Sequence, residues 1–239
     1  MIQTVSARVA EIVSEAREVK TFRFALEGPP VDYLPGQSLQ ISVPVPDGAR
    51  PITRRSFTIS SSPTEMGRLQ ITVKRNPPGV VSNYLHQAVN VGDALSLRAP
   101  FGRFTCVGED ASRICLIGGG SGITPLRAIL RSIVDRRAPV DVTLLDFNRS
   151  REDIIFYEEL EEIGRSAPGV RAIFCLTDPD PGWRGVTGRI SESLLDEAFN
   201  QKLPEVVYLC GPPPMMEAAI QLLTTLGMKP ERIRTETYR

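Results

Sequence analysis

Two glycine-rich turns in this sequence have the form of phosphate-binding loops. The longer one, Gly118-Gly119-Gly120-Ser121-Gly122-Ile123-Thr124-Pro125, follows a short apolar run and opens a segment of helical character. Glycines let the backbone approach a phosphate closely, and a helix N-terminus presents free N–H groups. The loop is not a G-x-G-x-x-G, because Ile123 stands at the last glycine position, and it lacks the lysine of a P-loop. It predicts a diphosphate site, with a structural turn as the alternative.

The shorter turn is Gly79-Val80-Val81-Ser82. The pattern predicts a helix over Ser82–Ala88 with Ser82 as its N-cap, again an arrangement that suits a phosphate. A plain helix cap is the alternative.

A third group combines a cation, an aromatic ring and hydroxyls: Arg55-Ser56-Phe57-Thr58-Ile59-Ser60-Ser61. The alternation of a strand would place Arg55, Phe57 and Ile59 on one face and Ser56, Thr58 and Ser60 on the other. An exposed sandwich strand is the alternative interpretation.

The fourth group is Cys210-Gly211-Pro212, which directly follows the predicted strand Val206–Cys210. Ligands of doubly wound sheets bind beyond the carboxyl ends of the strands. Cys210 is therefore expected at the ligand edge, with simple packing of a buried cysteine as the alternative.

The elements that must carry these groups differ between the two halves. Up to about Thr105, short strand-like runs such as Ser38–Val43 and Leu69–Val73 alternate with turn signals such as Pro35-Gly36 and Pro46-Asp47-Gly48. This spacing predicts a small antiparallel β-barrel or sandwich.

The second half alternates strands and helices, which predicts an α/β domain with a doubly wound parallel sheet. The predicted helices are Pro125–Asp135 with Thr124 as N-cap, Asp153–Ile163, and Glu217–Leu226. We place the boundary between domains 1–108 and 109–239.

Composition excludes several kinds of function. Lys+Arg and Asp+Glu both total 28, so the net charge is zero and neither a nucleic acid nor a membrane partner is expected. The cysteines (Cys106, Cys115, Cys175, Cys210) form no C-x-x-C and His86 is the single histidine, so no metal site is expected. Dispersed cysteines fit a cytoplasmic protein. Any redox centre in this chain should then be an organic cofactor.

The four groups, in this order, resemble the ferredoxin–NADP⁺ reductase family, in particular the reductase modules of bacterial oxygenases. The resemblance covers essentially the whole chain. It implies a flavin barrel followed by a nucleotide domain, binding FAD and NADPH or NADH. The residues that it assigns to cofactor binding are Arg55, Ser56, Phe57, Thr58, Ser61, Gly79, Val80, Val81, Ser82, Gly119, Gly120, Ser121, Gly122, Thr124, Pro125, Arg149, Ser150, Cys210, Gly211 and Pro212.

The resemblance also implies individual roles. Arg55 would pair with the flavin diphosphate, and Phe57, where the family usually has Tyr, would pack on the isoalloxazine. Thr58 would lie near flavin N5, and Cys210 beside nicotinamide C4, where it would shape hydride transfer without acting as a nucleophile. Tyr238 would cover the flavin face and move aside for the nicotinamide. Thr58, Cys210 and Tyr238 are thus the expected catalytic residues.

Coenzyme choice should depend on the end of the second nucleotide strand. Asp146 there would favour NADH by binding the ribose, whereas Arg149, Ser150 and Arg151 would favour the 2′-phosphate of NADPH. The resemblance favours NADPH, with Arg149 and Ser150 as ligands and a solvated loop as the alternative. The Gly-rich loop Trp183–Arg189 is a second hint of the nucleotide pocket, and a structural loop is the preferred interpretation.

The function implied is hydride transfer from NADPH or NADH to FAD, then single-electron transfer to a protein acceptor. The acceptor would be a ferredoxin, a flavodoxin, an oxygenase component, or a fused redox domain outside this chain. Two alternatives stay open: a flavin or ferric reductase acting on small acceptors, and a non-catalytic electron-transfer subunit of a larger flavoprotein complex.

Overall fold

The computed structural model describes residues 1–44, 52–106 and 111–238, in two compact units. The first unit comprises Met1–Val107 with Arg127–Ser132, and the second comprises Gly108–Leu126 with Ile133–Arg239. The boundary predicted between residues 108 and 109 lies outside the described residues, as does the predicted turn Pro46-Asp47-Gly48. The boundary therefore stays a prediction.

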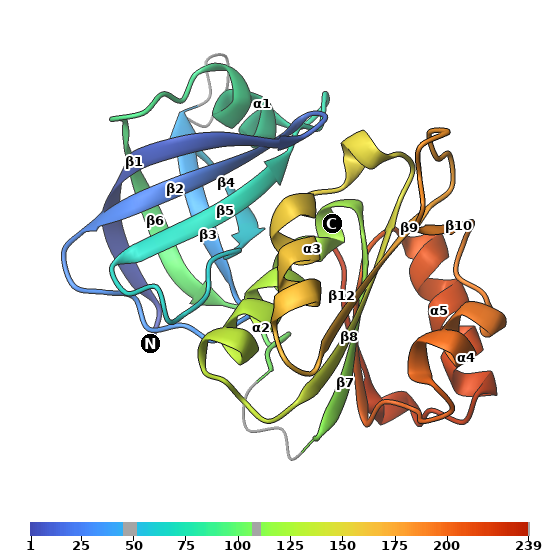
Figure 1. The fold of residues 1–239 in the computed structure, drawn as a ribbon. Helices are drawn as coiled ribbons and strands as arrows, with labels where there is room; N and C mark the ends of the chain where they lie inside the picture. Colours follow the sequence, from blue (N-terminus) through green and yellow to red (C-terminus); the bar gives the residue numbers. More distant parts are fainter. Residues whose placement is uncertain (45–51, 107–110, 239) are drawn as a thin grey trace. The chain divides into compact units, whose positions relative to one another are not determined.

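The first unit is an antiparallel barrel, as the sequence predicts. Its sheet has the strand order β4-β3-β6-β1-β2-β5, and a bridge between Ile59 and Ile71 joins the chain after β4 to β5 at the opposite edge. In Figure 1 the strands wrap around one interior, with α1 at one end of the barrel. The elements are β1 (Gln3–Ala16), β2 (Val19–Glu27), β3 (Ser38–Pro44), β4 (Ile52–Thr58), β5 (Arg68–Lys74), α1 (Val80–Gln87) and β6 (Ala94–Phe101).

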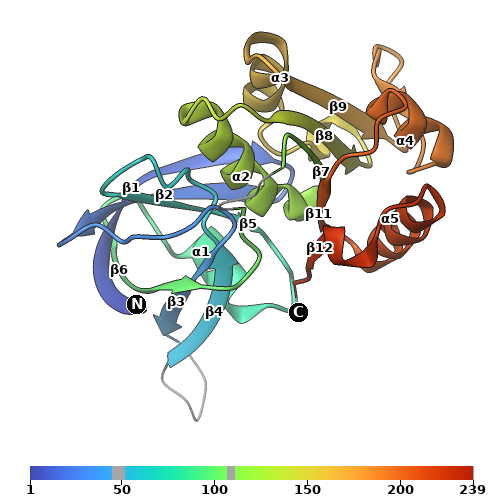
Figure 2. The same cartoon turned by 90° about the horizontal axis from the view of Figure 1, so that it is seen from below.

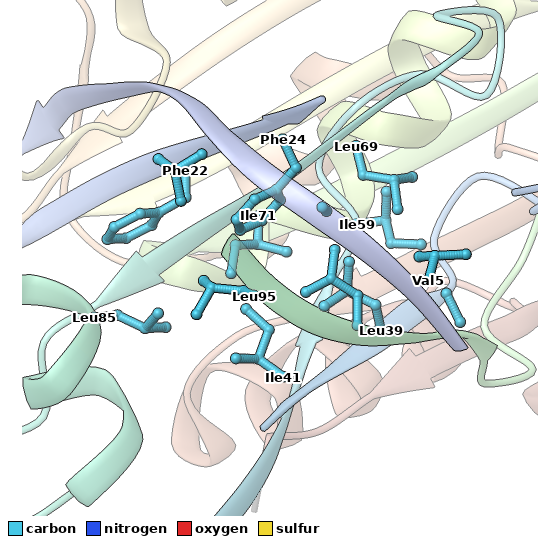
Figure 3. Close-up of a cluster of buried hydrophobic side chains, with 14 of the residues drawn as sticks. Val5, Phe22, Phe24, Leu39, Ile41, Ile59, Leu69, Ile71, Leu85 and Leu95 are labelled. Atoms are coloured by element: carbon cyan, nitrogen blue, oxygen red, sulfur yellow. The ribbon is translucent and has the colours of Figure 1, made fainter. Parts of the chain in front are cut away.

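Side-chain alternation along the strands builds the barrel core. In β3, Leu39, Ile41 and Val43 are buried while the residues between them are partly exposed. Figure 3 shows Leu39 and Ile41 in one cluster with aromatic and aliphatic side chains of β2 and β5. Burying each large apolar side chain stabilises the fold by about 1.5–3 kcal/mol, so this face holds the strand register.

The second unit is the predicted α/β domain. Its strands follow the order β10-β9-β8-β7-β11-β12, and every pair is parallel. The strands are β7 (Arg113–Gly119), β8 (Asp141–Asn148), β9 (Val170–Leu176), β10 (Val186–Thr187), β11 (Val206–Cys210) and β12 (Ile233–Glu236). The helices are α2 (Ile123–Asp135), α3 (Tyr157–Ser166), α4 (Glu192–Phe199) and α5 (Pro213–Thr225), with 3₁₀ turns at Gly120–Gly122, Arg151–Asp153 and Pro230–Arg232.

Helices cover both faces of this sheet. Within the second unit, Figures 1 and 2 show α3 and the first turn of α2 on one face and α4 and α5 on the other. The middle residues of β7 are therefore all buried, which explains the continuous apolar run Ile114–Ile117. Parallel strands end at the same edge, so the loops that follow β7, β8, β9 and β11 gather there.

Three predicted helix starts are wrong. Helix α1 begins at Val80 with Gly79 as N-cap, and α2 begins at Ile123, so neither Ser82 nor Thr124 is an N-cap. Helix α5 begins at Pro213, several residues before the predicted start. Each of these helices begins nearer to the preceding turn than the pattern of its apolar residues indicates.

Helix α3 begins later than the predicted start at Asp153. Ile154, Ile155 and Phe156 are all at most 5% exposed. One face of a surface helix cannot bury three successive residues, so this segment is irregular. Phe156 has a φ of +62° and the helix begins after it, at Tyr157.

Candidate functional site

In the barrel, the side chains of β4 change from exposed to buried along the predicted face. Arg55 is exposed, Phe57 is half-buried against the core cluster, and Ile59 has no exposed surface. Arg55 lies opposite Ile41 and Phe57 opposite Leu39, so both occupy core-facing register positions. A cation and an aromatic ring therefore lie on the core-facing side of β4, where the barrel interior reaches solvent.

The residues with hydroxyl groups that follow are buried. Ser60, Ser61 and Ser62 have no exposed surface, and Thr58 is 7% exposed. The Ser61 hydroxyl is hydrogen-bonded to that of Tyr33 at 2.8 Å and accepts from the backbone N–H of Gln70 at 3.1 Å. Ser61 thus connects β5 to the chain after β4, and its contact with a cofactor stays a prediction.

Side chains brace the turn before α1. Ser82 Oγ accepts from the N–H of Asn76 at 3.2 Å and lies 3.2 Å from the carbonyl oxygen of Gly79. Asn83 Nδ2 donates to the carbonyls of Asn76, Pro77 and Gly79. The first N–H groups of a helix have no intrahelical acceptor, so a turn held in this way presents donors of fixed direction to an anion.

In the second unit, the long glycine loop leads from β7 directly into α2. Gly120 has a φ of +54°, which starts the 3₁₀ turn that becomes the helix at Ile123. Thr124 Oγ1 donates to the carbonyl of Ser121 at 2.6 Å and is hydrogen-bonded to the hydroxyl of Tyr238 at 2.9 Å. Thr124 therefore links the loop to the C-terminal segment.

Tertiary contacts demand glycine at two loop positions. A Cβ on Gly122 would lie 2.1 Å from the carbonyl oxygen of Cys210, and one on Gly119 would lie 2.6 Å from Met215 Sδ. A Cβ on Gly211 would come within 3.1 Å of the Gly119 nitrogen. Two motifs about 90 residues apart in the sequence thus meet backbone to backbone at the carboxyl edge of the sheet.

Cys210 is the last residue of β11 and has no exposed surface. Burial raises the pKa of its thiol to about 12, and a hydrogen bond with Tyr238 opposes this only in part. The thiol is therefore protonated at neutral pH, which fits a neutral wall and not a nucleophile.

Polar side chains at the end of β8 and in the loop after it have partners within the second unit. Asp146 has no exposed surface, and its carboxylate accepts from Asn148 Nδ2 at 2.7 Å. Asp146 is thus buried within the unit, which does not fit the alternative in which it binds the ribose. Ser150 Oγ donates to Asp153 Oδ2 at 2.8 Å, while Arg149 is exposed and forms an ion pair with Asp178.

A pocket of about 540 Å³ lies beside this loop. It is lined by Tyr157, Phe174, Trp183 and the arginines at 151, 171 and 184, among others. The guanidinium of Arg151 lies 5.2 Å from the Trp183 ring. Asp178, Asp180 and Tyr157 were not among the residues predicted from the sequence, and a structural role was preferred for the Trp183 loop. The Asp-Pro-Asp-Pro run after β9 is a signal that could have pointed to this region.

None of the helices in the described ranges has the length and apolar character that crossing a membrane requires. Within residues 1–44, 52–106 and 111–238, no group of three His, Cys, Asp or Glu side chains is suited to a metal ion. None of the four cysteines takes part in a disulfide.

Comparison with known proteins matches both units to described families. A model described as the oxidoreductase FAD-binding domain matches residues 6–106, and one described as the oxidoreductase NAD-binding domain matches residues 116–221. The reductase subunit of glycine betaine monooxygenase from Chromohalobacter salexigens is 33% identical over 98% of this chain. This chain spans 64% of that protein's length.

Two further proteins cover the chain almost completely. NADH-cytochrome b5 reductase 1 of Aspergillus terreus is 33% identical over 89% of this chain and 74% of its own length. The FAD/NAD-binding domain of nitric oxide dioxygenase from Vibrio cholerae O1 biovar El Tor has a TM-score of 0.87 and 29% identity over 98% of both chains.

A flavin-type barrel followed by a parallel nucleotide-binding sheet defines the class of two-domain FAD- and NAD-binding reductases. Within that class, the chain belongs to the ferredoxin–NADP⁺ reductase family.

Proposed function

We propose that this chain is the FAD-dependent reductase module of an electron-transfer system, oxidising NADH or NADPH and reducing a protein acceptor. The observation that carries the proposal is the contact of Gly122 with the carbonyl of Cys210. It brings a diphosphate-type loop and the Cys-Gly-Pro turn together at the ligand edge of a doubly wound sheet.

The barrel residues fit FAD. Arg55 offers a planar guanidinium for a phosphate, Phe57 offers an apolar ring face, and the braced turn at Gly79 offers helix N–H donors. When bound, FAD accepts a hydride and releases electrons singly. The protein's own part is to orient the ring and to exclude water from it.

The residues of the second unit fit a nicotinamide dinucleotide. The N–H groups of Gly120–Gly122 would bind the diphosphate, and the buried neutral thiol of Cys210 would pack against the nicotinamide. The pocket beside Trp183 and Tyr157 would take the adenosine end, since aromatic faces suit a purine.

The acceptor we propose is a ferredoxin, a flavodoxin or an oxygenase component, or a redox domain outside these residues. The name of the Chromohalobacter relative, a monooxygenase reductase subunit, favours a protein acceptor over free flavin or iron. We assign the protein to the cytoplasm because its four cysteines form no disulfide.

Purification under mild conditions tests this proposal. We expect a yellow protein whose released flavin co-elutes with FAD on HPLC, which NADH or NADPH bleaches anaerobically, and which reduces ferricyanide. Faster turnover with a ferredoxin than with riboflavin supports a protein acceptor, and the reverse supports a small-molecule reductase. A protein that neither binds added FAD nor oxidises either nucleotide contradicts the proposal.

A further inference from the structure

Backbone hydrogen bonds hold the loops after β8 and β9 side by side. The N–H of Thr177 donates to the carbonyl of Asn148 at 3.1 Å, and the N–H of Asp178 donates to that of Arg149 at 2.8 Å. These bonds extend the ladder that pairs Asn148 with Leu176 at the ends of the two strands. Charged side chains on the two loops are therefore fixed neighbours.

Two ion pairs connect the loops. Arg149 Nε lies 3.5 Å from Asp178 Oδ2, and Arg151 Nε donates to Asp180 Oδ2 at 3.0 Å. The other oxygen of Asp180 accepts from the N–H of Gly182 at 2.8 Å. Asp180 therefore holds the turn before Trp183 and the guanidinium of Arg151 at the same time.

This charge balance disfavours a second phosphate. A 2′-phosphate is recognised by arginine or lysine side chains that carry uncompensated charge. Here each arginine of the β8 loop already has a carboxylate partner, and bringing a dianion near Asp178 and Asp180 adds repulsion. The hydroxyls of an unmodified ribose, in contrast, can donate to a carboxylate.

We propose that Asp178 and Asp180 make this chain selective for NADH, by neutralising Arg149 and Arg151 and by accepting from the adenosine ribose. The inference rests on the proposed function and reverses the preference for NADPH that the sequence favours. Arg184, which also lines the pocket, has no ion-pair partner within the described part of the chain and is the remaining cation that could attract a 2′-phosphate.

Binding of two nucleotide fragments tests the inference without any turnover. The fragments are 5′-AMP, which has a free 2′-hydroxyl, and 2′,5′-ADP, which carries the 2′-phosphate. Calorimetry measures both affinities at one salt concentration, because phosphate contacts depend on salt. Fluorescence supplies a second readout, since Trp183 is the single tryptophan of the chain and lines the pocket.

The variants are Asp178→Asn, Asp180→Asn and the double variant, each of which keeps the side-chain shape. Glu162→Gln is the matched control, because it removes a carboxylate from the Glu162–Arg165 ion pair on α3. We expect wild type to bind 5′-AMP at least about tenfold more tightly than 2′,5′-ADP. The double variant should change that ratio about tenfold or more towards 2′,5′-ADP, and Glu162→Gln should not change it. Adding Arg149→Gln to the Asp178→Asn variant should remove any shift of the affinity ratio towards 2′,5′-ADP that Asp178→Asn causes.

Three outcomes overturn the inference. The first is a wild-type preference for 2′,5′-ADP, above all one that Arg184→Gln abolishes. A ratio that the double variant leaves unchanged, while both fragments still bind, overturns the inference and leaves the proposed function intact. Binding of neither fragment nor either intact coenzyme overturns the proposed function together with the inference.

Discussion

The two glycine turns reach a similar shape by different means. In the nucleotide unit, Gly122 is pressed against the carbonyl of Cys210, and a Cβ at that position would lie 2.1 Å from the carbonyl oxygen. In the barrel, a Cβ on Gly79 would first meet the Ser82 hydroxyl, at 3.0 Å. At position 122 a distant strand leaves no room for a side chain, whereas at position 79 a nearby side chain limits the room. The two glycines therefore reflect different kinds of contact.

The buried polar groups of the two units differ as well. The barrel buries neutral hydroxyls that bond to one another, such as Thr21, Thr72 and Ser60. The nucleotide unit buries the carboxyl group of Asp146, which has one oxygen bonded to Asn148 and the other without a partner among the described atoms. The pH dependence of stability should therefore come mainly from the nucleotide unit.

Replacing Asp146 by Asn should give the largest effect. Burial raises the pKa of Asp146 from 3.8 to about 7. A raised folded-state pKa means that the wild type is most stable below pH 3.8 and loses stability as the pH rises to about 7. Asp146→Asn should thus be more stable by up to about 4 kcal/mol at about pH 8, at about 1.36 kcal/mol per pKa unit, and unchanged near about pH 3.5.

Urea unfolding at several pH values measures this gain. Asp141→Asn, which changes an exposed carboxylate at the start of the same strand, is the control. An equal gain at acidic and alkaline pH would show that Asp146 is not the titrating group.

Gly122→Ala should rank next, with a loss of about 3 kcal/mol, because two backbone segments must separate. Gly120→Ala is the matched control: its Cβ would meet nothing within 4 Å, so only the positive φ costs energy, about 1 kcal/mol. Equal losses in urea unfolding would mean that the contact with Cys210 does not set the loop.

Arg55→Gln tests the barrel site alone. We expect FAD to bind about thirtyfold more weakly, equivalent to about 2 kcal/mol for a charged hydrogen bond, while 5′-AMP binding stays unchanged. Arg54→Gln, on the opposite face of β4, should leave both affinities unchanged. Equal weakening of FAD by both variants, measured by flavin fluorescence, would argue against a specific phosphate contact.

Ser82→Ala should give the smallest effect, a loss of about 1 kcal/mol, because the N–H of Asn76 loses its acceptor. Gly79→Ala should then cost less in the Ser82→Ala background than in wild type, since the hydroxyl that a Cβ would meet is gone. Strictly additive losses in urea unfolding would refute the local bracing of this turn.

Strand and helix patterns predicted the class of each unit well. The continuous apolar run Ile114–Ile117 and the alternation in Ser38–Val43 both follow directly from which faces are buried. Helix starts were predicted poorly, because Gly120 turns the chain into α2 before the apolar periodicity begins. The side chains of Ile154, Ile155 and Phe156 delay α3 by entering the core.

The two domain classes and the order of the four motifs follow from the amino-acid sequence alone, since each depends on residues within one turn or one strand. Tertiary structure accounts for the other features. It buried Asp146, pressed Gly122 against Cys210, and paired Arg149 with Asp178. These outcomes depend on strand order and register, which bring residues from distant parts of the chain to one edge of a sheet.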